Sequence, residues 1–453
     1  MFIDDTICAP ATGTAGAAIA VIRLSGADTF AILSKVVEFR SPISEGGRVK
    51  YGVIKDLDEV LVSVFKAPHS YTGEDSAEIS CHCSPFIVSR ILELLTDNGA
   101  RMAGPGEFTR RAFVNGKMDL AQAEAVADLI SSESRVQHKL ALDQLRGAYS
   151  LELRGLRDEL VELGSLLELE LDFSEEDVEF ASREKLKRLL EDTLSQVESL
   201  ISSFKMGNAI RQGVPVAIVG EPNSGKSTLL NALLGEQRAI VSDIPGTTRD
   251  TVEETLNIGG VKFRFIDTAG LRESDETIEK IGIERSYAAI GKAKVILLVI
   301  DAANINVINC DTLEDGAFWD KYKYVKDIKA LISPDQRLIP VFNKVDLSPA
   351  PDGVLGISAL TGEGLEKLRD YICESVDFDT DHLLVSNERH CHALRVAAAS
   401  LRAVRDGLDR GVETDLLCLD LRSAVDSLNS IFGDRITPDE VLGNIFQRFC
   451  IGK

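Results

Sequence analysis

The stretch VPVAIVGEPNSGKSTLLNALLG, residues 214–235, joins an apolar run to a glycine-containing loop and then to an amphipathic segment. The loop has the pattern Gly-x-x-x-x-Gly-Lys-Ser, which ends at Lys226 and Ser227. Glycines let backbone N–H groups curl around phosphate oxygens, and the start of a helix adds its dipole and its free N–H groups. We expect Lys226 to reach the β- and γ-phosphates of a nucleotide and the Ser227 hydroxyl to bind Mg²⁺. The stretch therefore predicts a strand, a phosphate-binding loop and a helix, in that order.

A second group of motifs indicates that the bound base is guanine. The stretch LIPVFNKVD (338–346) ends a predicted strand with Asn343-Lys344-x-Asp346. A carboxylate at Asp346 can accept hydrogen bonds from both the N1–H and the N2 amino group of guanine, which adenine cannot supply. The segment ISAL (357–360) is typical of the loop that backs the base in GTPases. Together with the phosphate loop, these motifs predict a GTPase domain.

The segment FIDTAG (265–270) lies between the phosphate loop and the base motifs. Asp267 ends a predicted strand, where it is expected near the water shell of Mg²⁺, and Gly270 is expected near the γ-phosphate. The residues predicted to bind GTP are Asn223, Ser224, Gly225, Lys226, Ser227, Thr228, Ser242, Asp243, Ile244, Pro245, Gly246, Thr247, Thr248, Asp267, Thr268, Ala269, Gly270, Asn343, Lys344, Asp346, Ser358, Ala359 and Leu360.

Two details narrow the type of GTPase. Leu271 follows DTAG, where Ras-like enzymes keep a glutamine that orients water, so another group must position the water here. Asn223 within the phosphate loop and the segment SDIPGTTRD (242–250) resemble GTPases that use a monovalent cation in place of an arginine finger. That resemblance implies that Thr248 binds Mg²⁺ and that a K⁺ ion offsets charge in the transition state. It implies K⁺ ligands at Asn223, at Thr247 and at the backbone carbonyls of Ser242 and Ile244.

Periodicity divides the rest of the chain. Residues 1–117 mix short strand-like runs with turns. Helical spacing begins at Met118, and a predicted helix face carries Leu153, Leu156, Leu160, Leu163 and Leu167 at steps of three and four. Helical periodicity returns after residue 385. The simplest organisation is an α/β domain over 214–378, inserted into one helical domain made of 118–213 and 379–453. Two separate small helical domains are the alternative.

The composition limits the possible partners and locations. The chain has 453 residues and a net charge of −22, which argues against non-specific nucleic-acid binding over the whole surface. The best candidate for a local basic face is residues 389–411, which contain five arginines. Eight scattered cysteines favour reduced thiols and a cytoplasmic location. No apolar run is long enough for a membrane span, and no signal peptide is expected.

Two further stretches make the resemblance specific. With FTRRAFVNGKMDLAQAEAVADLI (108–130) upstream and CIGK (450–453) at the end, the chain resembles the MnmE (TrmE) family of tRNA-modification GTPases over essentially all of its length. The resemblance implies a multidomain α/β and all-α protein, with a P-loop GTPase domain inserted into a helical domain. An α+β domain over residues 1–117 would precede it, resembling folate-binding domains and forming a homodimer.

The resemblance also implies a chemistry. The family acts with the flavoprotein MnmG, and the resemblance implies that this chain forms a heterotetramer with it. The family adds an aminomethyl or carboxymethylaminomethyl group at C5 of the wobble uridine of certain tRNAs. The one-carbon unit would come from 5,10-methylenetetrahydrofolate or 5-formyltetrahydrofolate. The implied folate-binding residues are Arg23 in AVIRLSG, Glu78 in DSAEIS, Lys117 in NGKMD and the terminal Lys453.

Two residues receive catalytic roles by the same resemblance. Glu279 would position the attacking water, and its alternative is a solvated charge on a helix. Cys450 would handle substrate or a redox step, and its alternative is a small buried hydrophobe. The last helix, from TPDE (437–440), would carry Phe446, Phe449 and Ile451 to the folate-binding domain, across the dimer. The connection over residues 301–328 is longer than a minimal GTPase domain needs, and nothing in the sequence explains it.

Two other functions compete with this one. A GTPase switch in ribosome assembly would remodel RNA without modifying it, and it predicts an appended basic RNA-binding domain. Residues 379–453 are instead helical in pattern, with nine Lys/Arg against twelve Asp/Glu. A folate-dependent one-carbon enzyme regulated by GTP is the third possibility.

Overall fold

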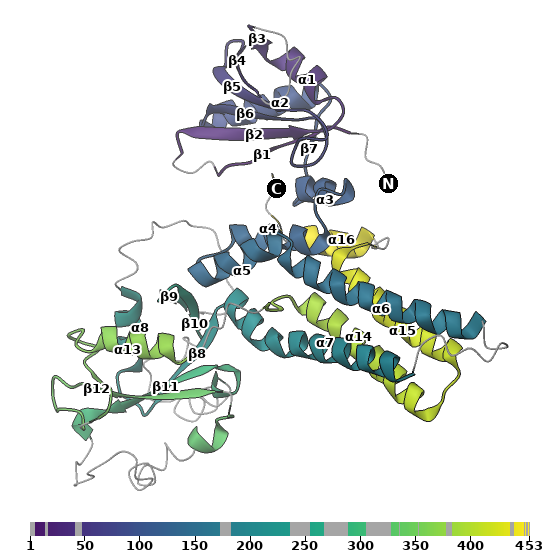
Figure 1. The fold of residues 1–453 in the computed structure, drawn as a ribbon. Coiled ribbons are helices and arrows are strands. Elements are labelled where there is room, and N and C mark those ends of the chain that lie inside the picture. Colours follow the sequence, from purple (N-terminus) through teal and green to yellow (C-terminus); the bar gives the residue numbers. More distant parts are fainter. Residues whose placement is uncertain are drawn as a thin grey trace. The chain divides into compact units, whose positions relative to one another are not determined.

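The computed structural model describes residues 5–13, 17–40, 48–172, 183–235, 254–266, 289–304, 328–334, 336–351, 353–376, 383–434, 439–447, 449 and 452. The chain forms two compact units, and each is described by itself. Figure 1 labels their helices and strands. The first unit contains residues 1–131, 141–195 and 396–453, and the second contains 132–140 and 196–395. One division follows residue 131, and the other three fall inside helices α5 (Arg135–Leu145), α7 (Arg183–Gln212) and α14 (Glu388–Arg410).

The first unit begins with an α+β domain on a seven-stranded sheet of order β3-β4-β5-β6-β2-β1-β7. All of the paired strands are antiparallel except β1 and β7. The strands are β1 (Ile7–Pro10), β2 (Ile19–Ser25), β3 (Glu38–Phe39), β4 (Arg48–Ile54), β5 (Asp58–Phe65), β6 (Ser76–His82) and β7 (Arg101–Met102).

Alternation along these strands separates the two faces of the sheet. On β2, Ile22 and Leu24 are buried in one apolar cluster with residues of helices α1 (Thr29–Val36) and α2 (Pro85–Asp97). Ile19, Val21 and Arg23 alternate with them and therefore point to the opposite face. This open face carries the first group of candidate site residues.

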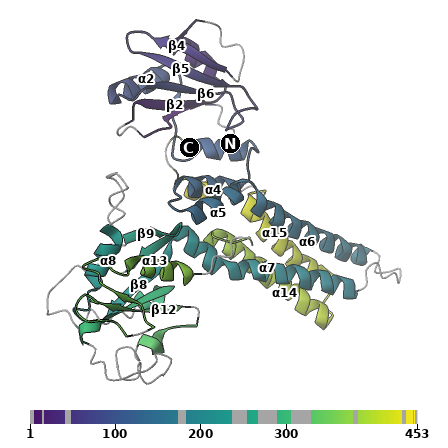
Figure 2. The ribbon, with the colours of Figure 1, turned by 60° about the vertical axis from the view of Figure 1, so that its left-hand side comes forward.

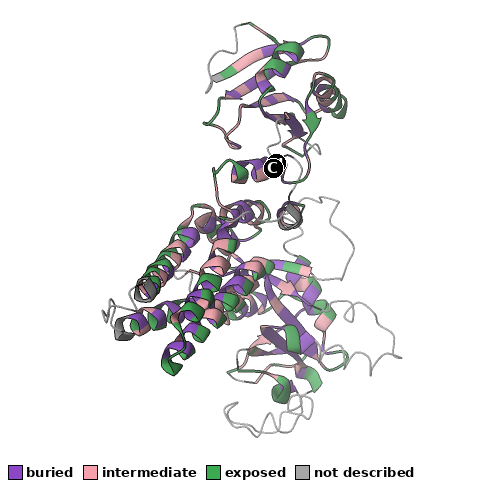
Figure 3. Cartoon of the chain, turned by 90° about the vertical axis from the view of Figure 1, so that its right-hand side faces the viewer, coloured by how far each residue is buried: buried purple, intermediate pink, exposed green. Residues whose placement is uncertain are grey.

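The rest of the first unit is helical. It contains α3 (Glu107–Val114), α4 (Leu120–Ile130), α6 (Ala148–Asp172), α15 (Thr414–Phe432) and α16 (Asp439–Phe446). The predicted leucine stripe from Leu153 to Leu167 is buried on α6, which packs against α15. Buried residues form stripes along the long helices, as an amphipathic pattern requires (Figure 3). Helix α15 stops at Gly433, which adopts φ 76°, a left-handed backbone that is typical of a glycine just after a helix.

The second unit contains a six-stranded sheet of order β13-β12-β11-β8-β10-β9. Its strands are β8 (Val214–Gly220), β9 (Glu254–Ile258), β10 (Val261–Phe265), β11 (Val295–Asp301), β12 (Arg337–Asn343) and β13 (Gly356–Ile357). The pairs are parallel except for the β9–β10 hairpin. Figure 2 shows this sheet with α8 (Lys226–Gly235) and α13 (Leu365–Glu374) beside it.

Both faces of this sheet are buried, which explains the apolar run that opens the phosphate-loop stretch. Val214, Val216 and Ile218 belong to one apolar cluster together with α8 and α13. Ala217 and Val219 alternate with them and pack into a second cluster on the other face.

The sheet therefore comes from a segment between α7 and α14, so a P-loop α/β domain is inserted into a helical domain. The individual boundaries at residues 117, 213 and 378 stay a prediction. None of the helices that the structure describes combines the length and apolarity needed to cross a membrane.

Candidate functional site

The phosphate loop connects β8 to α8 in the predicted order. Asn223 is exposed and Gly225 is half-buried, and both have left-handed backbones, with φ of 61° and 94°. A Cβ on Gly225 would lie 2.2 Å from Asn343 Nδ2, so this position has room only for glycine.

Lys226 begins helix α8 and folds back over the loop. Its Nζ donates to the carbonyl oxygens of Gly220 at 3.0 Å and Glu221 at 2.8 Å. Burial lowers the pKa of Lys226, against a smaller opposing effect of the Glu221 carboxylate. Ser227 and Thr228 follow in the first turn of α8, where the N–H groups of a helix start and the two hydroxyls can face an anion.

Asn343, the last residue of β12, joins the phosphate loop to the loop predicted to back the base. Its Nδ2 donates to the Ser224 carbonyl oxygen at 2.9 Å. Its Oδ1 accepts from the backbone N–H of Ala359 at 3.0 Å. The residue is 2% exposed, so both bonds are shielded from water. The structure thus brings Asn343 together with two other predicted motifs, the phosphate loop and the ISAL segment.

Lys344 and Asp346 lie beside this junction. Lys344 has a left-handed backbone, with φ of 68°, and its Nζ contacts Asp301 Oδ2 at 2.7 Å. Asp346 is exposed and can accept hydrogen bonds from a base. Ser358 is fully buried, whereas Leu360 is 80% exposed. A planar base beside these residues would meet a carboxylate at one edge and apolar surface next to it.

Several predicted residues fall outside the described part of the chain. These are Ser242, Asp243, Ile244, Pro245, Gly246, Thr247, Thr248, Asp267, Thr268, Ala269, Gly270, Glu279, Cys450 and Lys453.

A second group of predicted residues lies on the open face of the N-terminal sheet. Arg23 on β2 and Glu78 on β6 are directly opposite in register. Arg23 donates from Nε and Nη2 to Glu78 Oε1, at 3.0 and 2.7 Å. Lys117 is separate from this pair and donates from Nζ to the Pro68 carbonyl oxygen at 2.9 Å. The Arg23–Glu78 pair offers both a cation and a carboxylate to a polar ligand.

The chain terminus also reaches this pair. Arg23 Nη1 donates to the Gly452 carbonyl oxygen at 3.2 Å. Phe446 and Phe449 are buried in a cluster with Leu120 and Ala123 of α4. These contacts form within one chain, and the predicted docking across a dimer stays a prediction. Helix α16 packs against α3, and a Cβ on Gly106, just before α3, would lie 2.8 Å from the Phe446 carbonyl oxygen.

Comparison with known proteins agrees with the order of these elements. A family model described as the MnmE helical domain matches residues 120–450, and one described as the GTP-binding protein TrmE N-terminus matches residues 6–117. The chain belongs to the MnmE family of tRNA modification GTPases. A tRNA modification GTPase MnmE of Porphyromonas gingivalis is 48% identical, covering 100% of this chain and 99% of that protein. One of Bacteroides thetaiotaomicron is 45% identical, covering 99% and 100%.

Three residues that contact the predicted sites of this MnmE-family chain were not predicted from the sequence. Asp301 ends β11 and holds Lys344, and a charged residue at the end of a buried parallel strand was a usable signal. The rings of Tyr71 and Phe108 lie 5.5 and 5.7 Å from the Arg23 guanidinium. No sequence pattern points to these two contacts, because they depend on how a loop and α3 pack on the sheet.

Proposed function

We propose that this chain hydrolyses GTP to drive a modification of tRNA, the role named for its relatives. The observation that carries the proposal is that the Asn343 side chain donates to the Ser224 carbonyl and accepts from the Ala359 N–H, which links a phosphate-binding loop to a base-backing loop. A site that couples these two loops suits a nucleoside triphosphate rather than a simple anion. Asp346 would then select guanine over adenine.

The proposed metal ions are Mg²⁺ and K⁺, and Ser227 and Asn223 are the two proposed ligands that the structure describes. Mg²⁺ would be held by Ser227 in the first turn of α8 together with Thr248. K⁺ would be held by Asn223, whose side chain is exposed at the tip of the phosphate loop, with Thr247 and the carbonyls of Ser242 and Ile244. A cation there supplies positive charge between the phosphates as negative charge develops. Glu279 would position the water that Leu271 cannot orient.

The proposed one-carbon donor is a tetrahydrofolate, either 5,10-methylene- or 5-formyltetrahydrofolate. The donors of Arg23 and the carboxylate of Glu78 match the mixed donor and acceptor edges of a pterin ring. Arg23 is only 17% exposed and lies near two aromatic rings, which would shield a bound ring system from water. Lys117 and Lys453 would attract the carboxylates of the folate tail.

The proposed partners are a second copy of this chain, tRNA and the flavoprotein MnmG. The open face of the N-terminal sheet supports the homodimer, because Ile19, Val49 and Leu61 on it are 62, 63 and 51% exposed. With MnmG in a heterotetramer, the dimer would add an aminomethyl or carboxymethylaminomethyl group at C5 of the wobble uridine. Cys450 would face the reacting uridine or the flavin.

Reconstitution tests the proposal. The purified chain, the partner flavoprotein, a tetrahydrofolate donor, GTP and unmodified tRNA are incubated, and the nucleosides are analysed by mass spectrometry. We expect a modified uridine that requires both GTP and the folate. GTP hydrolysis with unchanged nucleosides would favour a ribosome-assembly switch, and one-carbon transfer without tRNA would favour a GTP-regulated folate enzyme.

A further inference from the structure

The loop between β5 and β6, residues 66–75, is held by α3 and by the residue that follows it. Three side chains, two on α3 and one on the residue after it, contact successive parts of the loop. The contacts are Thr109 Oγ1 with the Tyr71 hydroxyl at 2.9 Å, Asn115 Nδ2 with the Thr72 carbonyl oxygen at 2.8 Å, and Arg111 Nη1 with both Glu74 carboxylate oxygens at 3.3 Å. Side chains of α3 and of the residue after it therefore help to fix the conformation of the loop.

This loop carries two groups that contact the candidate folate residues. The Tyr71 ring lies under the Arg23 guanidinium, and the Pro68 carbonyl oxygen accepts from Lys117 Nζ. A Cβ on Gly73 would lie 3.3 Å from the Lys117 side chain, so the loop also packs along that side chain. Moving the loop would remove a contact from both Arg23 and Lys117.

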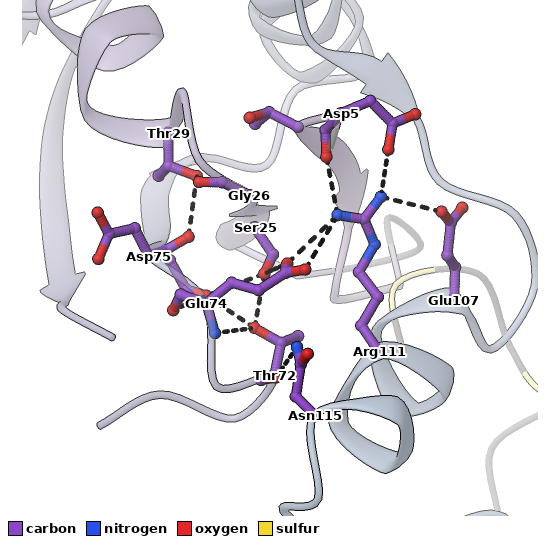
Figure 4. A network of polar contacts seen from close by, with 12 residues as sticks. Asp5, Ser25, Gly26, Thr29, Thr72, Glu74, Asp75, Glu107, Arg111 and Asn115 are labelled. Atoms are coloured by element: carbon purple, nitrogen blue, oxygen red, sulfur yellow. Dashed lines mark hydrogen bonds and ion pairs between the residues drawn. The ribbon is translucent and has the colours of Figure 1, made fainter. Parts of the chain in front are cut away.

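Arg111 is the most buried charge in this arrangement (Figure 4), with a side chain that is 6% exposed. Its Nη1 donates to the Asp5 carbonyl oxygen at 2.8 Å, and its Nη2 donates to Asp5 Oδ1 at 2.6 Å and Glu107 Oε1 at 3.2 Å. With Glu74 included, both terminal nitrogens are fully used. Arg111 therefore has no donor at its tip left for a ligand, and any role in the site is exerted through the loop.

Glu74 extends the contact from Arg111 to the strand that bears Arg23. Glu74 Oε2 accepts from the Ser25 hydroxyl at 2.7 Å, and Ser25 lies on β2 two residues after Arg23. Ser25 also shares a hydrogen bond of 2.6 Å with Thr72 in the loop. Buried ion pairs contribute little net stability, because desolvation opposes the attraction, but they can fix one geometry. Here the geometry that is fixed is that of the loop relative to β2.

We infer that Arg111 is a positioning residue for the folate site, acting through Glu74 to hold the β5–β6 loop against Arg23 and Lys117. The inference rests on the proposed use of a tetrahydrofolate by Arg23 and Glu78. Arg101 provides a matched control. It pairs with the same Asp5 and Glu107 carboxylates, at 2.6 and 2.7 Å, and no hydrogen bond or ion pair of its side chain reaches the loop in the described part of the chain.

The test is titration of the full-length protein with 5-formyltetrahydrofolate, with unfolding temperature and GTP hydrolysis measured in parallel. Arg111→Met should weaken folate binding about tenfold, the scale of one lost charge-assisted hydrogen bond, and leave GTP hydrolysis unchanged. Arg101→Met should lower the unfolding temperature while its folate affinity stays at the wild-type value. Equal affinity losses in both variants would show a role in general stability only and would overturn the inference.

Glu74→Gln decides the question if Arg111→Met does not fold, because it keeps the side-chain shape. We expect it to weaken folate binding and to speed hydrogen exchange of the amides in residues 66–75. Wild-type affinity and wild-type exchange in this variant would overturn the inference while the folate proposal stands. No binding by the wild-type protein would instead overturn the folate proposal itself, and with it this inference.

Discussion

Asn343 Nδ2 donates to the Ser224 carbonyl oxygen across 119 residues of sequence, at 2.9 Å. The same amide accepts from Ala359 N at 3.0 Å. One buried side chain therefore connects the end of β12, the phosphate loop and the base-backing loop. Neither loop can shift alone without breaking a shielded hydrogen bond, which costs about 1–3 kcal/mol.

Asn343→Asp tests this connection. The carboxylate can still accept from Ala359, but it cannot donate to the Ser224 carbonyl and places two acceptors face to face. We expect GDP and GTP affinity to fall at least about tenfold and the unfolding temperature of the second unit to drop. Calorimetric titration measures the affinity. Asn98→Asp, at the end of α2 in the other unit, removes an amide donor to Leu94 and should leave nucleotide binding unchanged.

Asp346→Asn tests base selection. The exposed carboxylate is replaced by an amide, which offers one acceptor and one donor instead of two acceptors. GTP affinity should fall by about a hundredfold, and xanthosine triphosphate, with a carbonyl in place of the amino group, should become the better ligand. Competition of the two nucleotides against a fluorescent analogue gives the ratio. An unchanged preference for GTP would mean that Asp346 does not contact the base.

The sequence predicted best what short-range patterns determine. The strand–loop–helix at Lys226 and the helix face from Leu153 to Leu167 follow from local spacing, and both are present. Register-dependent contacts could not be derived in this way. Lys344 meets Asp301 only because β11 and β12 pair in parallel, and Tyr71 meets Arg23 only because α3 fixes a loop. The K⁺-binding role of Thr247 and the catalytic roles of Glu279 and Cys450 stay predictions.

Hydrolysis should depend on K⁺, and Asn223 should be the reason. Asn223 has a left-handed backbone, so Asn223→Gly removes the amide without backbone strain, whereas Asn223→Ala adds strain. Turnover of the wild-type protein should fall about tenfold or more when Na⁺ replaces K⁺. Both variants should lose the difference between the two salts and keep most of their GTP affinity. Equal wild-type rates in Na⁺ and K⁺ would contradict the proposal.

Acid should loosen the N-terminal network before the rest of its domain. Burial raises the pKa of Glu107, but hydrogen bonds from Arg101 and Gly104 outweigh it, so the net pKa lies below the ordinary 4.5. The pKa of Asp5 is lowered below 3.8 by Arg101 and Arg111, also against burial. Stability from a lowered carboxyl pKa is complete above the unfolded-state value and is lost as pH falls through the folded-state value.

The expected window therefore opens below about pH 4.5 and extends to lower pH. Protection of the amides of residues 107–114, which is the intrinsic exchange rate divided by the observed rate at the same pH, should fall over that window. Glu107→Gln should show less protection than wild type at pH 7, and its protection should change less between pH 5 and 3, because it has no proton to bind. Identical pH profiles for the two proteins would show that Glu107 does not contribute.

The chain terminus gives the last prediction. Gly452 is buried and has φ of 95°, and a Cβ there would lie 2.2 Å from the Pro10 carbonyl oxygen. Its own carbonyl accepts from Arg23, so the backbone itself, in addition to any side chain, completes the Arg23 site. Gly452→Ala should push the terminus away from β1 and weaken folate binding. GTP hydrolysis should stay unchanged, because every predicted GTP ligand lies between residues 223 and 360.

Three further variants separate the roles of the terminus. Deletion of residues 450–453 should weaken folate binding and abolish tRNA modification, yet keep Phe446 and Phe449, whose rings lie 5.2 Å apart in the buried cluster. Deletion of Lys453 alone should weaken folate binding less, because the Gly452 carbonyl remains. Cys450→Ser should lose modification and keep folate affinity. The four-residue deletion retains Phe446 and Phe449. If it still modifies tRNA at the wild-type rate, the terminus acts only through the packing of these two residues.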